Sequence, residues 1–256
     1  MKFSIIMASY NQGEFIEQAI KSVLNQTYKN FELIIIDGMS TDNTPDIINK
    51  YKSHSNVKVI QEKDKGLYHA RNKGLLLATG DIISFLNSDD YYEPDSLKEI
   101  YNVFNNNEVD IVYGITKAVD KEGNFLWNMG QPFNKKKFIS HFKTIPDPST
   151  FFKSINLSLI GLYDTSLRFG GDGDFWQRCI NLNLSFYFYD KTITNYRVYN
   201  ETLTYKPELK KYRFKETIKI HRRYYTKIFS PYIIRLYYTY FIKHPLYPVY
   251  KYLLKK

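Results

Sequence analysis

Short apolar segments alternate with helical patterns over the first 110 residues of the chain. One of these segments, Phe31–Ile36, is apolar without alternation, which is typical of a parallel strand covered on both faces. The apolar segments predict strands at Lys2–Ala8, Phe31–Ile36, Val57–Ile60 and Ile82–Leu86. Apolar residues at helical spacing follow each strand and predict helices at Phe15–Leu24, from Thr44-Pro45 onward, at Leu67–Ala78 and at Pro94–Phe104. Four repeats of strand and helix indicate an α/β fold with a parallel, doubly wound half-sheet.

The pattern changes after Asp110, where the apolar segments become shorter. Strands are predicted at Ile111–Gly114, Thr116–Val119, Phe125–Trp127, Thr150–Lys153 and Ser185–Tyr189, with the third pairing back as a hairpin. A flexible acidic loop is predicted at Phe169–Asp174, and it leads into an amphipathic helix from Phe175 to about Leu182. The second half of the chain is thus expected to differ in character from the first.

Excess positive charge is confined to the end of the chain. The net charge is +10, yet positions 205–256 hold 14 Lys and Arg residues against two acids, Glu208 and Glu216, while positions 1–204 hold 22 bases and 24 acids. Tyr and Phe interleave with the bases, and Pro231, Pro245 and Pro248 predict several short helices in this tail. Such a tail suits an anionic membrane surface or a nucleic acid. It also suits a helical lid whose Lys and Arg stems cover apolar surface.

Cysteine content and hydropathy indicate the compartment. The single cysteine, Cys179, excludes an internal disulfide and favours a reducing environment. The five His residues are scattered without the spacing of a zinc site. The N-terminal apolar run is too short for a signal peptide, and no run of 18 apolar residues predicts a membrane-spanning helix. A cytoplasmic location is therefore expected.

Polar residues follow each of the four early strands. They are Ser9-Tyr10-Asn11, Asp37-Gly38, Asp64-Lys65-Gly66 and Asn87-Ser88-Asp89-Asp90. Parallel strands bring such ends to one edge of the sheet, where open α/β sheets bind their ligands. The adjacent carboxylates of Asp89 and Asp90 repel each other, which favours a cation beside them. The alternative is a turn in which Asn87, Ser88 and Asp89 only cap the next helix.

The ordered set of these motifs resembles the family 2 glycosyltransferases of GT-A fold. The likeness covers roughly residues 2–200 and rests on the order Ser9-Tyr10-Asn11, Asp37-Gly38-Met39-Ser40-Thr41-Asp42-Asn43-Thr44, Asp64-Lys65-Gly66, Ala70-Arg71-Asn72-Lys73-Gly74, Thr79-Gly80-Asp81 and Asn87 to Asp90. It implies a Rossmann-like, mostly parallel sheet flanked by helices, with the basic helical tail as a C-terminal extension. Positions 1–204 would form the catalytic domain, with a nucleotide-binding half at about 1–110 and an acceptor half at 111–204. Positions 205–256 would form the tail.

The resemblance also implies a donor site for a nucleotide sugar. Its residues would be Ser9, Tyr10, Asn11, Asp37, Asp64, Arg71, Asn87 and Ser88. Tyr10 would pack on the base, and Asp64 would lie beside the nucleoside. Arg71 would approach the diphosphate, as would Arg197 after the last strand. The alternatives are that Tyr10 only shields a strand end and that Arg71 is a plain surface residue of its helix.

Two carboxylates would carry the chemistry that the resemblance implies. Asp89 matches the ligand of Mn²⁺ or Mg²⁺ in the family's Asp-x-Asp motif, with Asn87 in place of the first Asp. Asp172 matches the general base that deprotonates the acceptor hydroxyl, although Gly171 stands where relatives often carry Glu. Gly38 likewise replaces a second acid after Asp37. Asp174 is expected to cap the helix that begins near Phe175.

The implied activity is that of a metal-dependent, inverting enzyme. It would move one sugar from a nucleotide-diphosphate sugar, with UDP favoured, to a glycan or polyprenyl-linked glycan in the synthesis of a cell-surface polysaccharide. The Gln-x-x-Arg-Trp motif of processive relatives is missing, and Gln177-Arg178 lacks its spacing. This acceptor class favours the inner face of the plasma membrane as the partner of the tail, over nucleic acid. The competing classes are a nucleotidyltransferase, which would need a Gly-rich phosphate loop after the first strand, and a non-catalytic protein that binds a sugar nucleotide or a polyanion.

Overall fold

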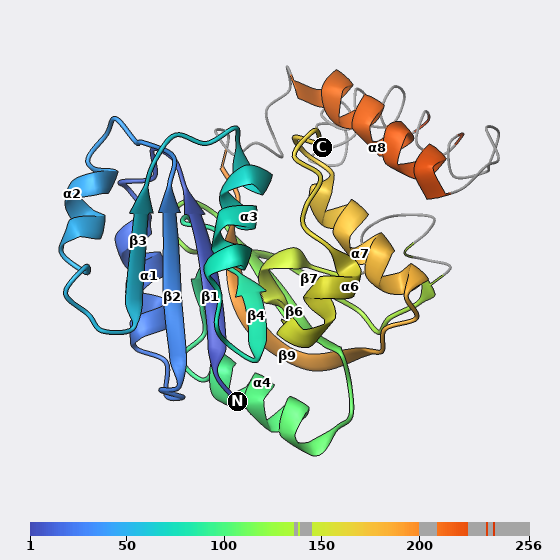
Figure 1. Ribbon diagram of the computed structural model, residues 1–256, viewed down its shortest axis with the longest axis horizontal. Helices are drawn as coiled ribbons and strands as arrows, with labels where there is room; N and C mark the ends of the chain where they lie inside the picture. The colour runs from blue at the N-terminus through green and yellow to red at the C-terminus, as the bar shows by residue number, and fades with distance from the viewer. Residues whose placement is uncertain (136–137, 139–144, 200–208, 225–233, 235–237, 239–256) are drawn as a thin grey trace, which may run out of the picture. The chain divides into compact units, whose positions relative to one another are not determined.

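The computed structural model of the chain describes residues 1–135, 138, 145–199, 209–224, 234 and 238 (Figure 1). The chain divides into two compact units. The first comprises Met1–Ser166 with Gly171–Tyr199, and the second comprises Leu167–Gly170 with Asn200–Lys256. The first unit therefore includes the residues of every predicted strand.

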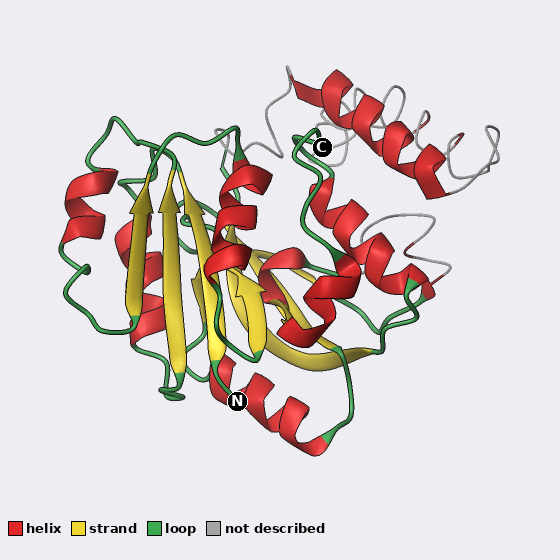
Figure 2. Ribbon diagram, viewed as in Figure 1, coloured by secondary structure: helices red, strands yellow, loops and turns green. Residues whose placement is uncertain are grey.

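A single mixed sheet forms the frame of the first unit (Figure 2). Its strands are β1 Phe3–Ser9, β2 Phe31–Asp37, β3 Val57–Gln61, β4 Ile82–Phe85, β5 Tyr91–Tyr92, β6 Ile111–Val119, β7 Phe125–Met129, β8 Thr150–Lys153 and β9 Phe186–Arg197. They lie in the order β3-β2-β1-β4-β8-β6-β9-β5, and β7 pairs with β6. β3, β2, β1 and β4 are parallel, as predicted, whereas β8 is antiparallel to both of its neighbours.

Helices cover both faces of the parallel half of the sheet. The helices of the first unit are α1 Ile16–Leu24, α2 Thr44–Asn49, α3 Leu67–Leu77, α4 Ser96–Asn106, α6 Leu157–Ile160 and α7 Gly171–Asn181. On β2, Leu33 and Ile35 belong to the same core cluster as the apolar face of α1, while Ile34 and Ile36 pack with Ala70 of α3. Successive side chains of a strand point to opposite faces, so both sets of β2 residues are buried. This explains the continuous apolar run that predicted the strand.

Three predicted boundaries in the second half were wrong. β6 is one strand through Gly114 rather than two, with a register shift against β9 beside this glycine. β9 extends to Arg197 rather than ending at Tyr189, because it continues along β6 and then pairs with β5. α7 begins at Gly171, so the predicted loop is helical in its second part. Asp172 and Asp174 lie in the first turn of α7, where negative charge interacts favourably with the helix dipole.

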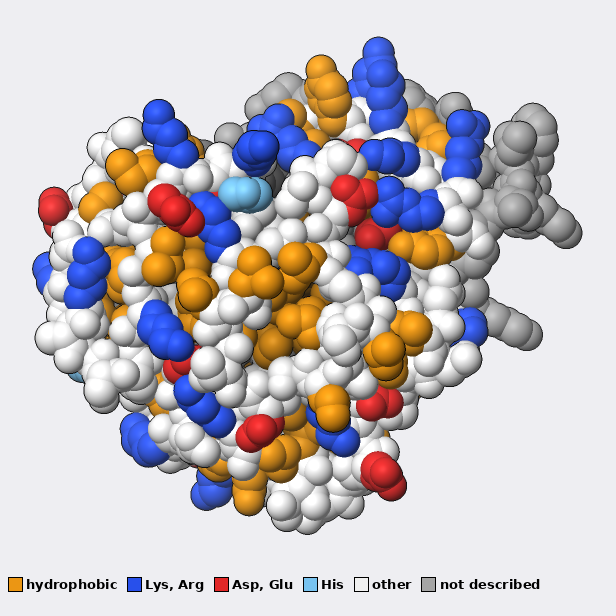
Figure 3. All heavy atoms as spheres, in the orientation of Figure 1, with side chains coloured by type: hydrophobic (Ala, Val, Ile, Leu, Met, Phe, Trp, Pro, Cys, Tyr) orange, Lys and Arg blue, Asp and Glu red, His pale blue; other side chains and the backbone are white. Residues whose placement is uncertain are grey.

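Of the predicted helical tail, one helix lies within the described residues, α8 Lys210–Tyr224. Its exposed face carries the basic residues Lys211, Lys215, Lys219 and Arg222, while Phe214 and Ile220 are buried. Figure 3 shows Lys and Arg side chains gathered over this helix. The predicted breaks at Pro231, Pro245 and Pro248 lie outside the described residues. No described helix is both long and apolar enough to span a bilayer.

Candidate active site

Tyr10, Gly38 and Asp64 come together at the carboxyl edge of the parallel strands. The Tyr10 side chain is 59% exposed. A Cβ atom on Gly38 would lie 2.7 Å from Asp64 Oδ2 and 3.4 Å from Cδ2 of Tyr10. The space that a second acid would need after Asp37 is therefore filled by the Asp64 carboxylate. An exposed aromatic ring can pack on a nucleobase, and a carboxylate beside it can accept a hydrogen bond from an N–H group of that base.

Asp37 and Asn11 hold the loops around this group. The Asp37 carboxylate is fully buried and accepts hydrogen bonds from the Ser40 hydroxyl and from Ser40 N at 3.1 Å. Asn11 adopts a left-handed backbone conformation (φ 52°), which Asn tolerates well, and its Oδ1 accepts Thr41 N at 2.8 Å. The Ser9 hydroxyl is buried and has no hydrogen-bond partner within the described part of the chain. Asp37 and Asn11 thus shape the predicted donor site.

Asp89 and Asp90 follow β4 and have different surroundings. Tyr199 Oη donates to Asp89 Oδ2 at 3.0 Å, and Asp89 remains partly exposed. Asp90 is fully buried; its two oxygens accept Arg197 N at 2.9 Å and Asn87 Nδ2 at 2.9 Å. Burial raises the pKa of Asp89, and burial with the adjacent Asp89 charge raises that of Asp90 well above its ordinary value. Asp89 therefore faces outward from a loop that Asp90 anchors.

The donor set at Asp89 fits a hard divalent cation that shares its ligands with a substrate. No cluster of three or more His, Cys, Asp or Glu side chains in the described ranges could hold a metal ion without help. Mg²⁺ sites commonly use one or two protein carboxylates and complete the coordination with phosphates and water. Neither Asp89 nor Asp90 forms an ion pair with a described Lys or Arg, although the Arg197 charge acts on both carboxylates. Asp89 would be the ligand of such a cation.

Arg197 lies beside the Asp89 loop, and its expected place near a diphosphate stays a prediction. It is 3% exposed, and its guanidinium donates to the backbone oxygens of Asp89 and Lys121 and to Gln18 Oε1. The bond to the Asp89 carbonyl satisfies a backbone acceptor of this loop. Arg197 thus stabilises the conformation of the Asp89 loop through these hydrogen bonds.

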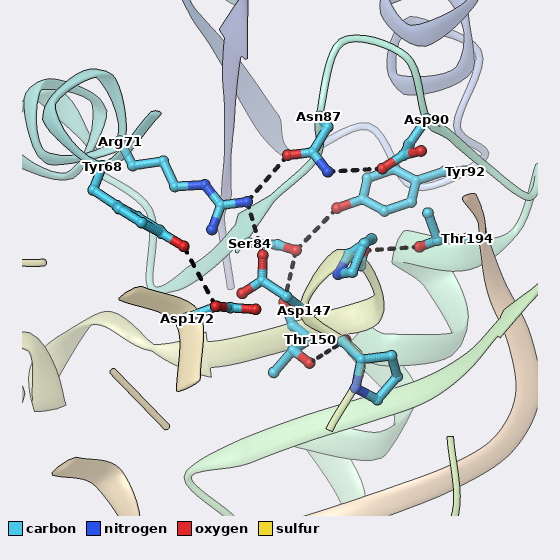
Figure 4. Close-up of polar contacts among 12 residues, drawn as sticks. Tyr68, Arg71, Ser84, Asn87, Asp90, Tyr92, Asp147, Thr150, Asp172 and Thr194 are labelled. Atoms are coloured by element: carbon cyan, nitrogen blue, oxygen red, sulfur yellow. Dashed lines mark hydrogen bonds and ion pairs between the residues drawn. The ribbon is translucent and has the colours of Figure 1, made fainter. Parts of the chain in front are cut away.

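Arg71 connects the Asp89 loop to a second acid that the sequence analysis missed (Figure 4). Its Nη2 lies 2.7 Å from Asp147 Oδ2 and donates to Asn87 Oδ1 at 3.1 Å. The guanidinium also lies 4.7 Å from the ring centroid of Phe85. Arg71 is 3% exposed, so the alternative of a plain surface residue is wrong. Its predicted contact with a diphosphate stays a prediction.

Asp172 lies in the first turn of α7, beside the buried ring of Tyr68. Tyr68 Oη donates to Asp172 Oδ1 at 3.4 Å. Burial, and after it the charge of Asp147, raise the pKa of Asp172 to about 6. A Cβ atom on Gly171 would come within 2.7 Å of the Tyr68 ring, so the Glu of related sequences has no room here. Asp172 is thus a half-buried carboxylate that ionises near neutral pH, which suits a general base.

Asp174 was wrongly predicted to cap the helix. The helix begins three residues before it, and Asp174 is 1% exposed and forms an ion pair with Arg178 at 3.2 Å. This i,i+4 pair stabilises the first turns of α7. Asp172, with its half-exposed side chain, is the acid of this turn that can meet a substrate.

Removing the charge of Asp147 is expected to destabilise the fold strongly. Asp147→Ala leaves the buried Arg71 guanidinium without its carboxylate, and breaking a buried ion pair costs about 3–5 kcal/mol. Denaturant unfolding of this variant would measure the loss. The matched control is Glu62→Ala, which removes the partner of Lys73 in a pair whose Glu is exposed and is expected to cost about 1 kcal/mol or less. Equal losses in the two variants would contradict the assigned role of Asp147.

Asp147, Tyr68 and Tyr199 are site residues that sequence reasoning did not find. Asp147 stands between two prolines, far along the chain from Arg71, and no spacing rule links the two. Tyr68 is one of 24 tyrosines, and Tyr199 follows the last strand without any motif. The only available signal was that Tyr68 lies three residues before Arg71, on one face of a predicted helix.

Comparison with known proteins identifies the family to which the chain belongs. The family model described as "Glycosyl transferase family 2" matches residues 4–161, more than half of the chain. The chain belongs to glycosyltransferase family 2. The predicted resemblance is thereby confirmed. The matched region holds the loops of Tyr10, Asp64 and Asp89, together with Arg71 and Asp147, whereas Asp172 lies beyond it.

Relatives of this family-2 chain differ in length. It is 33% identical over 183 residues to a PGL/p-HBAD biosynthesis glycosyltransferase of Mycobacterium tuberculosis, covering 70% of each chain. It is 35% identical over 130 residues to an uncharacterised glycosyltransferase of Nostoc, covering 47% of this chain and 40% of the relative. The chain thus spans less than half of the Nostoc protein.

Two solved structures confirm the GT-A fold. S. aureus TarS in complex with UDP-GlcNAc matches with a TM-score of 0.73 and 20% identity, covering 93% of this chain and 73% of that one. The mannosyltransferase PcManGT of Pyrobaculum calidifontis, in complex with GDP-Man and Mn²⁺, matches with a TM-score of 0.67 and 17% identity, covering 95% and 71%. The α/β fold predicted for this family-2 chain is therefore confirmed.

Proposed function

We propose that this protein is an inverting glycosyltransferase that moves one sugar from a nucleotide-diphosphate sugar to a hydroxyl group of a glycan or lipid-linked glycan. One observation carries the proposal. Two carboxylates flank Arg71 and its hydrogen-bond partner Asn87. Asp89 is partly exposed and suited to a metal, and Asp172 is half-buried and suited to a base. Synthesis of a cell-surface polysaccharide is the proposed setting.

The nucleoside of the donor would bind at Tyr10 and Asp64. The Tyr10 ring is exposed enough to pack on a base, and Asp64 Oδ2 lies at the space that Gly38 leaves open. A carboxylate oxygen accepts the N–H group that uracil and guanine carry on their pairing edges. TarS in complex with UDP-GlcNAc and PcManGT in complex with GDP-Man are consistent with either base. A UDP-sugar remains the favoured donor.

The diphosphate would lie at the Asp89 loop. Asp89 would hold Mn²⁺ or Mg²⁺, and a metal bound there supplies Lewis-acid stabilisation of the departing nucleoside diphosphate. The Mn²⁺ in the PcManGT complex supports this choice of ion. Tyr199 and Arg197 would keep the loop in position through the hydrogen bonds that they donate to the Asp89 side chain and backbone.

Asp172 would act as the general base of the transfer. It accepts the proton of the acceptor hydroxyl while that oxygen forms its bond to the anomeric carbon, and the bond from this carbon to the diphosphate oxygen breaks. The leaving group departs from the face opposite the attacking oxygen, so the anomeric configuration inverts. Tyr68 would orient the Asp172 carboxylate through its hydroxyl.

The basic face of α8 would bind an anionic membrane surface near a lipid-linked acceptor. Lys211, Lys215, Lys219 and Arg222 lie along one exposed side of the helix. Each basic residue near an anionic bilayer contributes about 1 kcal/mol, which adds up for such a stripe. This assignment supports peripheral association with the inner face of the plasma membrane.

A panel of UDP-, GDP- and dTDP-sugars tests the proposed reaction. With Mn²⁺ present, we expect slow release of one nucleoside diphosphate without acceptor, and its loss when EDTA removes the metal. Liquid chromatography of the released nucleotide gives the rate and the identity of the donor. Binding of a sugar nucleotide without any turnover, with or without metal and acceptor, would instead favour a non-catalytic binding protein.

A further inference from the structure

β7 carries a tryptophan that the rest of the chain leaves partly uncovered. Trp127 is 40% exposed, whereas Trp176, the only other tryptophan of the sequence, is 1% exposed. Tryptophan is highly buried on average in folded proteins, and it is enriched at binding surfaces because its ring is large and apolar and still carries an N–H donor. The exposure of Trp127 therefore points to a contact with another molecule.

The register of the sheet determines which face carries the Trp127 side chain (Figure 1). Trp127 lies opposite Ala118 of β6, and Met129 lies opposite Thr116. Alternate residues of a strand share a face, and so do directly opposed residues of neighbouring strands. Trp127 and Thr116 accordingly lie on the same face of the sheet.

That face also packs against η1, the single 3-10 turn Asp147–Ser149. The Thr116 hydroxyl forms a hydrogen bond with the Ser149 hydroxyl. The threonine opposite it on β9 donates its own hydroxyl to the η1 backbone at 2.8 Å. The first residue of η1 is the acid that pairs with Arg71. Trp127 thus lies on the face of the sheet that holds the Arg71 network of the candidate active site.

A β-bulge directs the other aromatic side chain of β7 to the opposite face. Phe125 lies opposite Val119, and Trp127 lies opposite the preceding residue of β6, so Leu126 is an extra residue in the pairing. Without this residue, the two rings would alternate regularly with the strand and lie on one face. With it, only Trp127 faces η1. Phe125, which is 59% exposed, then offers a matched control.

The start of β7 is connected to the Asp89 loop. Arg197 donates one hydrogen bond to the Asp89 carbonyl and another, at 2.7 Å, to the carbonyl of Lys121 in the turn that precedes β7. The end of the strand lies opposite the threonine that binds η1. β7 therefore runs beside the candidate site, and the surface of Trp127 is continuous with it.

We propose that Trp127 binds the acceptor glycan, with its indole ring packed on the apolar face of a sugar ring. The proposal rests on the proposed function, in which the acceptor is a glycan. A pyranose ring has C–H groups on its faces and hydroxyls around its edge, which suits a ring with an apolar face and one N–H donor. The nucleoside of the donor already has Tyr10 as its proposed aromatic contact, so the acceptor is the substrate left for Trp127.

Tryptophan fluorescence tests this contact without donor or metal. Because Trp176 is buried, a change of emission on addition of a sugar reports on Trp127. The probes are cellotriose, chitotriose, maltotriose and mannotriose at millimolar concentration. At least one of them is expected to shift the emission to shorter wavelength, because the sugar replaces water on the indole face and ring packing tolerates different partners. No shift with any of these probes would overturn the proposal.

Calorimetry with the trisaccharide that binds tightest separates Trp127 from the rest of β7. Trp127→Ala is expected to weaken binding about tenfold or more, and Trp127→Tyr, which keeps an aromatic face, should keep most of the affinity. Phe125→Ala removes a more exposed ring from the opposite face and should bind as the wild type does. Equal losses in the two Ala variants, or no loss in either, would overturn the proposal.

A second copy of the chain is the competing occupant of this surface. Among the described strands β7 pairs only with β6, and an edge strand can pair with another chain. Analytical ultracentrifugation measures the oligomeric state. A wild-type dimer that dissociates in Trp127→Ala would assign the ring to that contact and overturn the proposal, whereas a monomer that binds the trisaccharide supports it.

Transfer assays link the contact to the reaction. With the donor found in the sugar-nucleotide panel and the same trisaccharide, Trp127→Ala should raise the acceptor KM about tenfold with kcat unchanged, since the lost contact is made equally in the ground state and the transition state. An unchanged acceptor KM, or no transfer to a bound trisaccharide, would overturn the role with the acceptor. Trisaccharide binding at Trp127 in a protein that turns over no sugar nucleotide would instead keep the sugar contact and refute the proposed function.

Discussion

Asp172→Asn is expected to lower the rate of sugar transfer about 10²–10⁴-fold, which is the usual contribution of a general base. The amide keeps the size of the side chain and can still accept the Tyr68 hydrogen bond, so the fold should be kept. It cannot take up the proton of the acceptor hydroxyl. Donor binding should be unchanged, because Asp172 acts on the acceptor. Single-turnover kinetics with and without acceptor separate the two steps.

The pH dependence of the wild-type enzyme gives a second check on Asp172. The base must be ionised to accept a proton, and burial with the Asp147 charge raises the pKa of Asp172 to about 6. The rate should therefore rise as the pH increases through about 6 and level off above it. The matched control is Asp46→Asn, an exposed acid in the first turn of α2, which should keep both the rate and the profile. Full transfer by Asp172→Asn would assign the base to another group.

The sequence predicted the parallel half of the fold well because burial there is two-sided. β1 and β2 each contain a continuous apolar run, and α1 and α4 each show one apolar stripe, so pattern alone predicts these elements. β9 could not be delimited in this way. Its middle residues Asp190 and Lys191 are exposed and polar, and the strand continues only because β6 and β5 offer partners far away in the chain.

The candidate site was predictable where motifs are local and not where partners are distant. Tyr10, Asp64 and Asp89 each follow a strand, so their common edge could be inferred from topology. The replacements at Gly38 and Gly171 could be seen in the sequence but not explained. Gly171 has a steric reason, since the Tyr68 ring occupies the space beside it. Beside Gly38 the nearest atom is the terminal oxygen of the Asp64 side chain, which can shift. The role of Asp147 could not be predicted from the sequence, because its ion pair with Arg71 depends on tertiary structure alone.

Asp89→Ala is expected to abolish the metal dependence of donor turnover and to lower its rate about 10²-fold or more, since a bound metal contributes several kcal/mol of charge stabilisation. The substitution should leave the loop folded. Arg197 bonds the backbone oxygen of residue 89 rather than its side chain, and Asp90 keeps its own bonds to Asn87 and Arg197. Rates measured over a Mn²⁺ titration would rise in the wild type and stay flat in the variant.

Two further variants decide whether that loss belongs to the carboxylate of Asp89. Asp81→Ala makes the same change at the other end of β4, next to an exposed turn, and should keep the full response to Mn²⁺. Tyr199→Phe removes only the hydroxyl that donates to Asp89 Oδ2, so its rate should fall about tenfold or less. If Asp89→Ala kept a Mn²⁺-dependent rate, the cation would have to bind elsewhere. Asp90 could not replace Asp89 without breaking its hydrogen bonds to Arg197 and Asn87, since both of its oxygens are used.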